Sequence, residues 1–252
     1  MIDEGYVTTE LENGIRTITF FHPKSNSLPG NLLRKLAFEI EKAGEDSETK
    51  VVILKSDGER AFCAGASFDE LASIEDFETG VRFFSGFAEV INAARKCPKF
   101  ILGRIHGKAV GGGVGLVSAC DYALAVEKAS VRLSEISLGI GPFVIAPAIE
   151  RKIGTARFAA MTIDHEWRNA QWCLKTGLYQ AVFSTLQELD DAATKLAKKL
   201  AKTSPNAMAE LKKMFWRGTD EWDDLLIKNA EISGRLVLSD YAKNFIAEFK
   251  AK

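Results

Sequence analysis

Hydrophobic and polar positions follow two different periods in the first part of the chain. Two stretches rich in apolar and β-branched residues, 7–11 and 15–21, flank Asn13-Gly14, a pair typical of a tight β-hairpin turn. Apolar residues then recur every three or four positions over 32–40, with charged residues between them. The second spacing predicts an amphipathic helix, so we expect a hairpin followed by a helix.

Short, continuous apolar runs mark the middle of the chain. Residues 51–54 read Val-Val-Ile-Leu, and residues 100–105 and 122–126 are similar. Such runs are typical of strands that are buried on both faces, as in a parallel sheet covered by helices. The other elements predicted here are strands ending at Phe62 and covering 131–133, and helices over 69–95, with a break near 73–78, and over 114–120.

The pattern changes after about residue 155. Apolar residues at helical spacing over 192–200 and a helix predicted from Pro205 to Phe215 are followed by no strand pattern. We therefore expect an α/β core over 1–190 and a helical region over 191–252. The helical region carries more aromatic residues than a lone surface helix should, which indicates packing on a neighbouring subunit or on the chain's own core. These aromatic residues are Phe215, Trp216, Trp222, Phe245 and Phe249.

Composition narrows the functional classes. The 252 residues are 46% hydrophobic and 27% charged, with a net charge of −1, which gives no sign of a nucleic-acid or membrane partner. From the acidic start of the chain we expect no secretory signal, and no apolar run approaches the length of a membrane span. The four cysteines lack paired spacing, so we expect reduced thiols in a cytoplasmic protein, with Cys63 as a small packed residue.

The sequence gives little support for a metal site or for a nucleophilic serine. None of the three histidines, His22, His106 and His165, has a second metal ligand three or four residues away, so we expect no metal site. No serine lies in a Gly-x-Ser-x-Gly turn.

Two turns rich in glycine and alanine, with a carboxylate downstream, are the strongest chemical signal. They are 62–66 (Phe-Cys-Ala-Gly-Ala) and 111–116 (Gly-Gly-Gly-Val-Gly-Leu), and Glu135 comes twenty residues after Gly115. Two backbone N–H groups that converge on one carbonyl oxygen would form an oxyanion hole. Glu135 lies in a stretch with few charges, so its carboxyl is either partly buried, with a raised pKa, or hydrogen-bonded at a helix start.

Two rival interpretations of the glycine run are weaker. A dinucleotide-binding turn should follow a strand directly, yet seven residues separate Ile105 from Gly113. The acid that this motif needs should end the next strand, yet Glu135 comes nine residues after Val126. A phosphate-binding P-loop fails because no Gly-Lys-Ser/Thr closes the run.

Taken together, these motifs resemble the crotonase (enoyl-CoA hydratase/isomerase) superfamily over nearly the whole chain. The resemblance rests on 61–66, 107–116, Cys120-Asp121, 127–129, Glu135 with Leu138-Gly139, Gly177-Leu178 and 204–207. It implies an α/β fold, the ClpP-like crotonase spiral of strand–strand–helix units, with a C-terminal helical region that mediates homotrimers, often paired into hexamers.

The resemblance also implies roles for particular residues. The N–H groups of Ala66 and Gly112 would hold the thioester oxygen of an acyl-CoA substrate, and Glu135 would be the catalytic acid–base residue. Coenzyme A would be part of the substrate, with no separate cofactor. Further substrate contacts are expected from Ser25, Ala64, Ser67, Phe68 and Gly111.

One departure from the family pattern affects the reaction type. Many hydratases of the family use two glutamates, and the first of these positions holds Gly115 here. A single carboxylate suffices to isomerise a 3-enoyl-CoA, whereas two share the work of hydration well. Resemblance to a bacterial branch of branched-enoyl-CoA hydratases, methylglutaconyl-CoA among the substrates, favours hydration, with Gly115 leaving room for a bulky or carboxylate-bearing substrate. Isomerisation and catalytically silent binding of a CoA thioester are the alternatives.

Overall fold

A six-stranded sheet forms the framework of the protein in the computed structural model, which describes residues 5–250. The strand order is β1-β2-β4-β7-β9-β12, and every neighbouring pair is parallel except β1 and β2. The strands are β1 (Tyr6–Glu12), β2 (Ile15–Phe21), β4 (Val51–Ser56), β7 (Phe100–Ile105), β9 (Tyr122–Val126) and β12 (Ala181–Phe183).

The predicted hairpin and the buried strands are confirmed. Asn13 and Gly14 join β1 to β2 with φ angles of 51° and 79°, the left-handed conformation that a tight hairpin turn requires. The Val-Val-Ile-Leu run lies in β4, between β2 and β7, and all four of its side chains are buried. Continuous apolar character was therefore a correct sign of a strand inside the sheet.

Two smaller sheets build the region that will hold the site. One contains β11 (Arg168–Asn169), β10 (Ser130–Arg132), β8 (Lys108–Val110) and β5 (Ala61–Cys63), and the other pairs β3 (Ser27–Leu28) with β6 (Gly65–Ala66). The sequence did not predict β8, which ends directly before Gly111. The prediction that no strand lies directly before the glycine run was therefore wrong. The turn still differs from a dinucleotide-binding motif, because Glu135 lies nine residues beyond the end of β9, where the acid of that motif should be.

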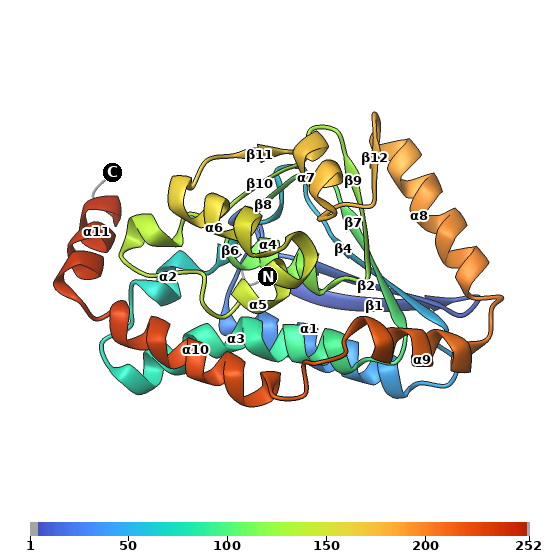
Figure 1. Cartoon of the computed structure of the whole chain (residues 1–252), viewed down its shortest axis with the longest axis horizontal. Helices are drawn as coiled ribbons and strands as arrows, with labels where there is room; N and C mark the ends of the chain where they lie inside the picture. Colours follow the sequence, from blue (N-terminus) through green and yellow to red (C-terminus); the bar gives the residue numbers. More distant parts are fainter. Residues whose placement is uncertain (1–4, 251–252) are drawn as a thin grey trace.

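The helices are arranged around these sheets (Figure 1). They are α1 (Gly30–Glu45), α2 (Phe68–Leu71), α3 (Phe77–Lys96), α4 (Gly112–Ala119), α5 (Ala146–Ile153), α6 (Thr155–Asp164), α7 (Ala170–Thr176), α8 (Leu186–Leu200), α9 (Pro205–Phe215), α10 (Trp222–Leu236) and α11 (Asp240–Lys250), with a 3₁₀ helix, η1 (Glu135–Leu138). Helix α10 packs along α3, where Gly80 and Gly234 let the two backbones approach closely. Helix α8 covers part of the large sheet through β4, β7 and β9.

The predicted elements differ from the structure mainly at their ends. The break in the long helical stretch is confirmed, because α2 and α3 are separate helices. Helix α4 starts two residues earlier than predicted, and β10 lies one residue earlier. The sequence missed β3, β6, β11 and β12, which have only two or three residues each and show no period.

The aromatic residues of the helical region divide between two environments. Trp216 and Trp222 are buried in the chain's own core and meet edge to face at 5.8 Å. Phe215 and Phe249 are about half exposed. The sequence left both environments open, and the boundary at residue 190 stays a prediction.

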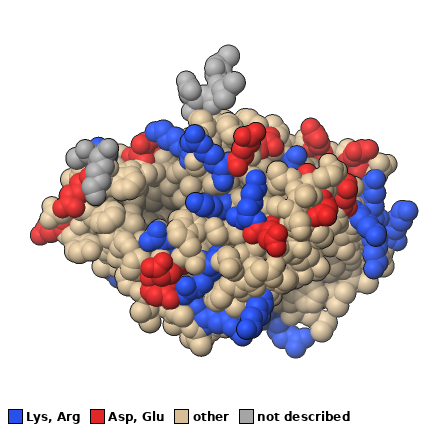
Figure 2. All heavy atoms as spheres, turned by 90° about the horizontal axis from the view of Figure 1, so that it is seen from above, with Lys and Arg blue, Asp and Glu red and all other residues tan. Residues whose placement is uncertain are grey.

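The surface carries charges of both signs. Figure 2 shows Lys and Arg side chains interspersed with Asp and Glu on the face seen from above, without an extended basic area on that face. Within residues 5–250, no helix combines the length and apolar character needed to cross a membrane.

Candidate active site

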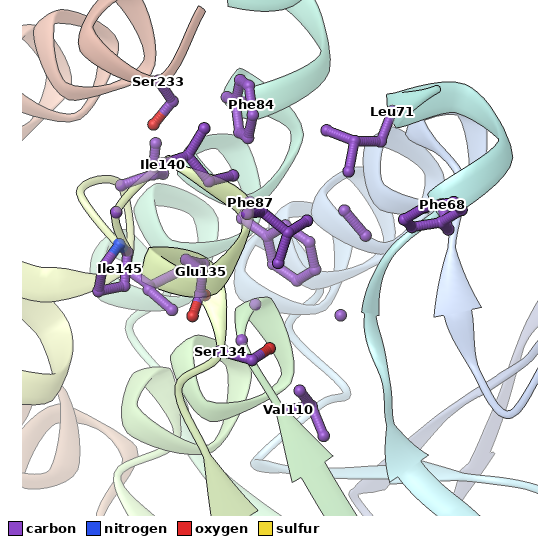
Figure 3. Close-up of a pocket in the computed structure, with 18 of the residues that line it drawn as sticks. Phe68, Leu71, Phe84, Phe87, Val110, Ser134, Glu135, Ile140, Ile145 and Ser233 are labelled. Atoms are coloured by element: carbon purple, nitrogen blue, oxygen red, sulfur yellow. The ribbon is translucent and has the colours of Figure 1, made fainter. Parts of the chain in front are cut away.

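A cavity of about 530 Å³ opens between the small sheets, α3 and η1 (Figure 3). The C-terminal helices α10 and α11 close part of its outer side. Most of the side chains that line the cavity are apolar. Among the described lining residues, only Arg132 and Glu135 have side chains that carry a charge. The cavity can therefore hold an apolar chain with a single carboxylate at its wall.

The two glycine-containing turns meet at this cavity. Gly65 and Gly111 have φ angles of 93° and 53°, in the left-handed region that favours glycine. A Cβ on Gly65 would lie 3.0 Å from the carbonyl oxygen of Val110 and 3.7 Å from the nitrogen of Gly112, so the turns are in contact. Ala66 ends β6 and Gly112 begins α4, and both line the cavity. The first N–H groups of a helix have no partner within the helix and favour negative charge.

Glu135 begins η1 and places its carboxylate beside the second turn. A Cβ on Gly111 would lie 2.8 Å from Oε1 of Glu135, so only glycine leaves room for the carboxylate there. Oε2 is buried and has no hydrogen-bond partner among the described residues. Burial raises the pKa of Glu135 from its ordinary value of 4.5 to about 7, against weaker opposing hydrogen bonds from backbone N–H groups. Figure 3 shows Glu135 between Ile145 and Phe87.

Most of the residues predicted from the sequence lie together. Those that line the cavity are Ala64, Ala66, Phe68, Gly111, Gly112 and Glu135. The structure does not bring the other two into the wall. Ser67 caps α2, accepting a hydrogen bond from the N–H of Glu70, and Ser25 has a φ of 55° in the turn before β3. Ser27 lines the cavity instead.

The room expected at Gly115 is already filled. A Cβ there would lie 2.5 Å from Cγ2 of Ile145 and 2.9 Å from its Cβ. Ile145 is buried and lines the cavity, whereas Gly115 does not. The prediction that a substrate group could occupy this space was therefore wrong, because the chain supplies its own side chain from the segment before α5.

Sequence reasoning missed the aromatic wall of the cavity. Phe83, Phe84 and Phe87 line it from α3, and Phe245 and Phe249 line it from α11. Phe249 contacts Phe68 with ring centroids 4.5 Å apart, which joins the C-terminal helix to α2. The three phenylalanines of α3 lie at helical spacing, which in sequence looks the same as ordinary core packing.

Arg132 was also missed. It lies in β10, and its Nε donates a hydrogen bond to the carbonyl oxygen of His165 at 2.6 Å. Its guanidinium carbon lies 5.9 Å from the ring centre of Trp167, and no carboxylate within residues 5–250 forms an ion pair with it. A lone arginine within a strand pattern gives no sign of a cavity in the sequence.

Thiol chemistry does not fit the site. Cys63 is fully buried, as predicted, and is absent from the cavity wall. Burial raises the pKa of its thiol to about 12, so the thiolate needed for nucleophilic attack is disfavoured.

The arrangement suits proton transfer beside a carbonyl group. A carbonyl oxygen placed between the N–H groups of Ala66 and Gly112 would be stabilised as it gains negative charge. A carboxyl with a pKa of about 7 can both accept and return a proton near neutral pH. The apolar wall would exclude bulk water and strengthen both effects.

Comparison with known proteins agrees with this geometry. The family model "Enoyl-CoA hydratase/isomerase" matches residues 10–241. The chain is 27% identical to "Probable enoyl-CoA hydratase" of Bacillus subtilis (strain 168), covering 98% of this chain and 96% of that protein. It is also 27% identical to "Short-chain-enoyl-CoA hydratase" of Clostridium acetobutylicum, covering 98% and 95%.

A solved structure confirms the fold. The enoyl-CoA hydratase from Bacillus halodurans superimposes with a TM-score of 0.89 at 23% identity, covering 96% of this chain and 99% of that one. The α/β crotonase spiral with C-terminal helices, expected from the sequence, is therefore correct. Because this family model spans nearly its whole length, the chain belongs to the enoyl-CoA hydratase/isomerase (crotonase) family.

Proposed function

We propose that the protein hydrates a 2-enoyl-CoA thioester. Glu135 takes a proton from water as the water oxygen bonds to C3 of the substrate, and the electron pair of the double bond moves into the thioester. The N–H groups of Ala66 and Gly112 hold the resulting enolate oxygen. Glu135 then gives the same proton to C2, which completes the addition of one water molecule.

The observation that carries this proposal is the place of the Glu135 carboxylate. It lies against Gly111, directly before the amide that would bind the oxygen, and its buried Oε2 has no hydrogen-bond partner within residues 5–250. One carboxylate can serve both steps, because it accepts and returns the same proton on one face of the substrate. The names of two relatives that match the chain over almost their full length also favour hydration.

A second function, isomerisation of a 3-enoyl-CoA to a 2-enoyl-CoA, is favoured by one specific observation. Ile145 fills the space beside Gly115, and the described cavity wall holds no carboxylate besides Glu135. An apolar group at this place would disfavour a bound water molecule. In this reaction Glu135 would remove a proton from C2 and return it to C4.

We infer further that the acyl chain carries a distal carboxylate, as in methylglutaconyl-CoA. Arg132 supports this inference, because it is the one cationic residue among the described lining residues and its guanidinium, beside His165 and Trp167, forms no ion pair within residues 5–250. Arg132 is only three positions from Glu135 in the chain, so the two residues cannot be far apart. This closeness suits recognition of a group on a short acyl chain better than recognition of the phosphates at the far end of the pantetheine arm. A guanidinium pairs well with a carboxylate through two parallel hydrogen bonds.

Three substrates separate these possibilities. The purified protein is incubated with crotonyl-CoA, 3-methylglutaconyl-CoA and a 3-enoyl-CoA, and the products are identified by mass spectrometry. Addition of one water to a 2-enoyl substrate is the expected result. Turnover of the 3-enoyl substrate alone would refute hydration in favour of isomerisation, and turnover of none would favour a silent CoA-thioester binding protein.

Arg132→Met tests the distal carboxylate. Loss of a charged hydrogen-bonded pair should raise the KM for the dicarboxylic substrate by about 10- to 100-fold and leave crotonyl-CoA unaffected. Lys108→Met is the matched control, because Lys108 contacts the same Trp167 ring but does not line the cavity. Equal losses with both substrates would show that Arg132 supports the structure rather than recognising an anion.

We also infer a homotrimer, or a hexamer built from two trimers, from the family. Support comes from large apolar side chains exposed on the C-terminal helices, where Met214 and Tyr241 are 56% and 63% exposed. Light scattering on the eluting protein measures the mass of the assembly, and a monomer would refute this inference.

A further inference from the structure

A second cavity, of about 730 Å³, lies on the face of the large sheet that α8 partly covers. It shares no lining residue with the candidate active site. Its floor comes from β2, β4 and β7, and its rim from the segments that follow β4 and β9 and from the start of α8. Ligands of parallel α/β sheets bind outside the carboxyl ends of the strands, and this cavity lies at that edge.

Two buried polar side chains point to an occupant. His106 and Ser56 line the cavity and are only 2% and 3% exposed. Both ring nitrogens of His106 and the hydroxyl of Ser56 lack a hydrogen-bond partner in the described part of the chain. Buried polar groups are normally paired, so three unpartnered atoms in one cavity indicate that something polar binds there.

Two of the three cationic residues that line the cavity are not engaged in ion pairs among the described residues. Arg104 is neutralised by a two-point ion pair with Asp190, at 2.6 and 2.9 Å. Asp57 accepts a hydrogen bond from the neutral hydroxyl of Tyr6 and keeps its negative charge. The two lysines of the cavity, Lys55 and Lys128, have no carboxylate partner within residues 5–250. Of the cavity's acids, Asp57 and Glu59 have no cationic partner within residues 5–250, and Glu59 is exposed.

We propose that this second cavity binds a phosphate monoester of a small organic molecule. Lys55 and Lys128 would neutralise the phosphate dianion, and His106 and Ser56 would donate hydrogen bonds to its oxygens. Lysine ammonium groups are point charges that suit phosphate. The start of α8 adds the positive end of a helix dipole at the rim, where Leu186 lines the cavity. The volume exceeds what a free phosphate needs, so the cavity has room for an organic part attached to it.

The ionisation of His106 provides a direct readout. Burial, with Arg104 and Lys128 nearby, lowers its pKa to about 4, while Asp57 and Asp190 act weakly in the opposite direction. The ring is therefore neutral at pH 7 in the empty cavity. A bound dianion would stabilise the charged ring and raise this pKa.

Nuclear magnetic resonance of the histidine rings tests the proposal on the full chain. The chain has three histidines, so a His106→Gln variant assigns the resonances. Phenyl phosphate and inorganic phosphate are the probes. We expect saturable shifts at His106 but not at His22 or His165, a raised pKa for His106, and tighter binding of phenyl phosphate.

Variants separate this site from a general effect of charge. Replacing both Lys55 and Lys128 with Met should weaken phenyl phosphate binding at least about tenfold. Lys35→Met, on the exposed face of α1, should bind as the wild type does. Absent saturation at His106, equal affinity in the double variant, or tighter binding of inorganic phosphate would each overturn the proposal. Turnover of acyl-CoA substrates, measured in the same variants, should not change, whichever reaction the first cavity performs.

Discussion

Replacing Glu135 with Gln removes the charge and proton-transfer ability of the candidate catalytic group while keeping its size. We expect kcat to fall at least about 10²-fold, the contribution typical of a positioned acid–base group. Binding of the CoA thioester should change little, because the proposed oxygen contacts come from backbone N–H groups. In the wild type, kcat/KM should rise through a pH of about 7, since hydration needs the ionised carboxylate.

The same variant should alter stability in the opposite direction. The folded state raises the pKa of Glu135 from 4.5 to about 7, so it disfavours the charged form. At about 1.4 kcal/mol per pH unit, keeping this charge in the fold costs about 3 kcal/mol above pH 7. The protein loses this stability as pH rises from about 4.5 to 7, because the folded state holds the proton more tightly than the unfolded state. Glu135→Gln should therefore stabilise the protein at pH 8 and leave stability at pH 4 unchanged.

Two measurements check these expectations together. Steady-state turnover over pH 5–9 gives the activity profile, and chemical denaturation at pH 4 and pH 8 gives the free energy of unfolding. Glu127→Gln is the control, because Glu127 is exposed and is not among the described residues that line the cavity. An unchanged kcat would show that Glu135 is not the proton-transfer group. If the difference in unfolding free energy between Glu135→Gln and the wild type were the same at pH 4 and pH 8, the raised pKa of a buried Glu135 would be refuted.

The remaining predictions concern the filled space beside α4 and a buried ion pair. Gly115→Glu alone should lower the free energy of unfolding by about 1–3 kcal/mol in chemical denaturation, because the new Cβ would collide with Ile145. The double change with Ile145→Ala should recover stability and raise crotonyl-CoA hydration, and no gain would show that a second acid is not limiting. Lys212 and Asp121 form an ion pair at 2.8 Å and are almost fully buried, so Lys212→Met should cost about 3–5 kcal/mol of unfolding free energy. The exposed Lys213→Met should cost little, and equal losses would contradict the role of burial.

The sequence predicted the elements that have a clear period or a specific turn. The hairpin at Asn13-Gly14, the buried strand at 51–54 and the separate helices α2 and α3 are all present. Strands such as β8 were missed because three residues are too few to show alternation. Such short strands nevertheless set the site, since β8 ends where Gly111 turns.

The site was predictable where it depends on backbone and not where it depends on long-range packing. The two turns could be found because glycine permits conformations and close approaches that other residues do not. The filling of the space beside Gly115 could not be predicted, because Ile145, which occupies it, lies thirty residues away in the chain. Arg132 and the phenylalanines of α3 also became part of the cavity only through the fold.

A structure with a bound, unreactive acyl-CoA analogue would show whether the two turns bind the thioester oxygen beside Glu135. We expect the thioester oxygen to lie about 2.7–3.1 Å from the backbone nitrogens of both Ala66 and Gly112. We also expect the Glu135 carboxylate to lie beside the C2 and C3 carbons of the acyl chain. A thioester oxygen that faces solvent, or a Glu135 directed away from these carbons, would contradict it.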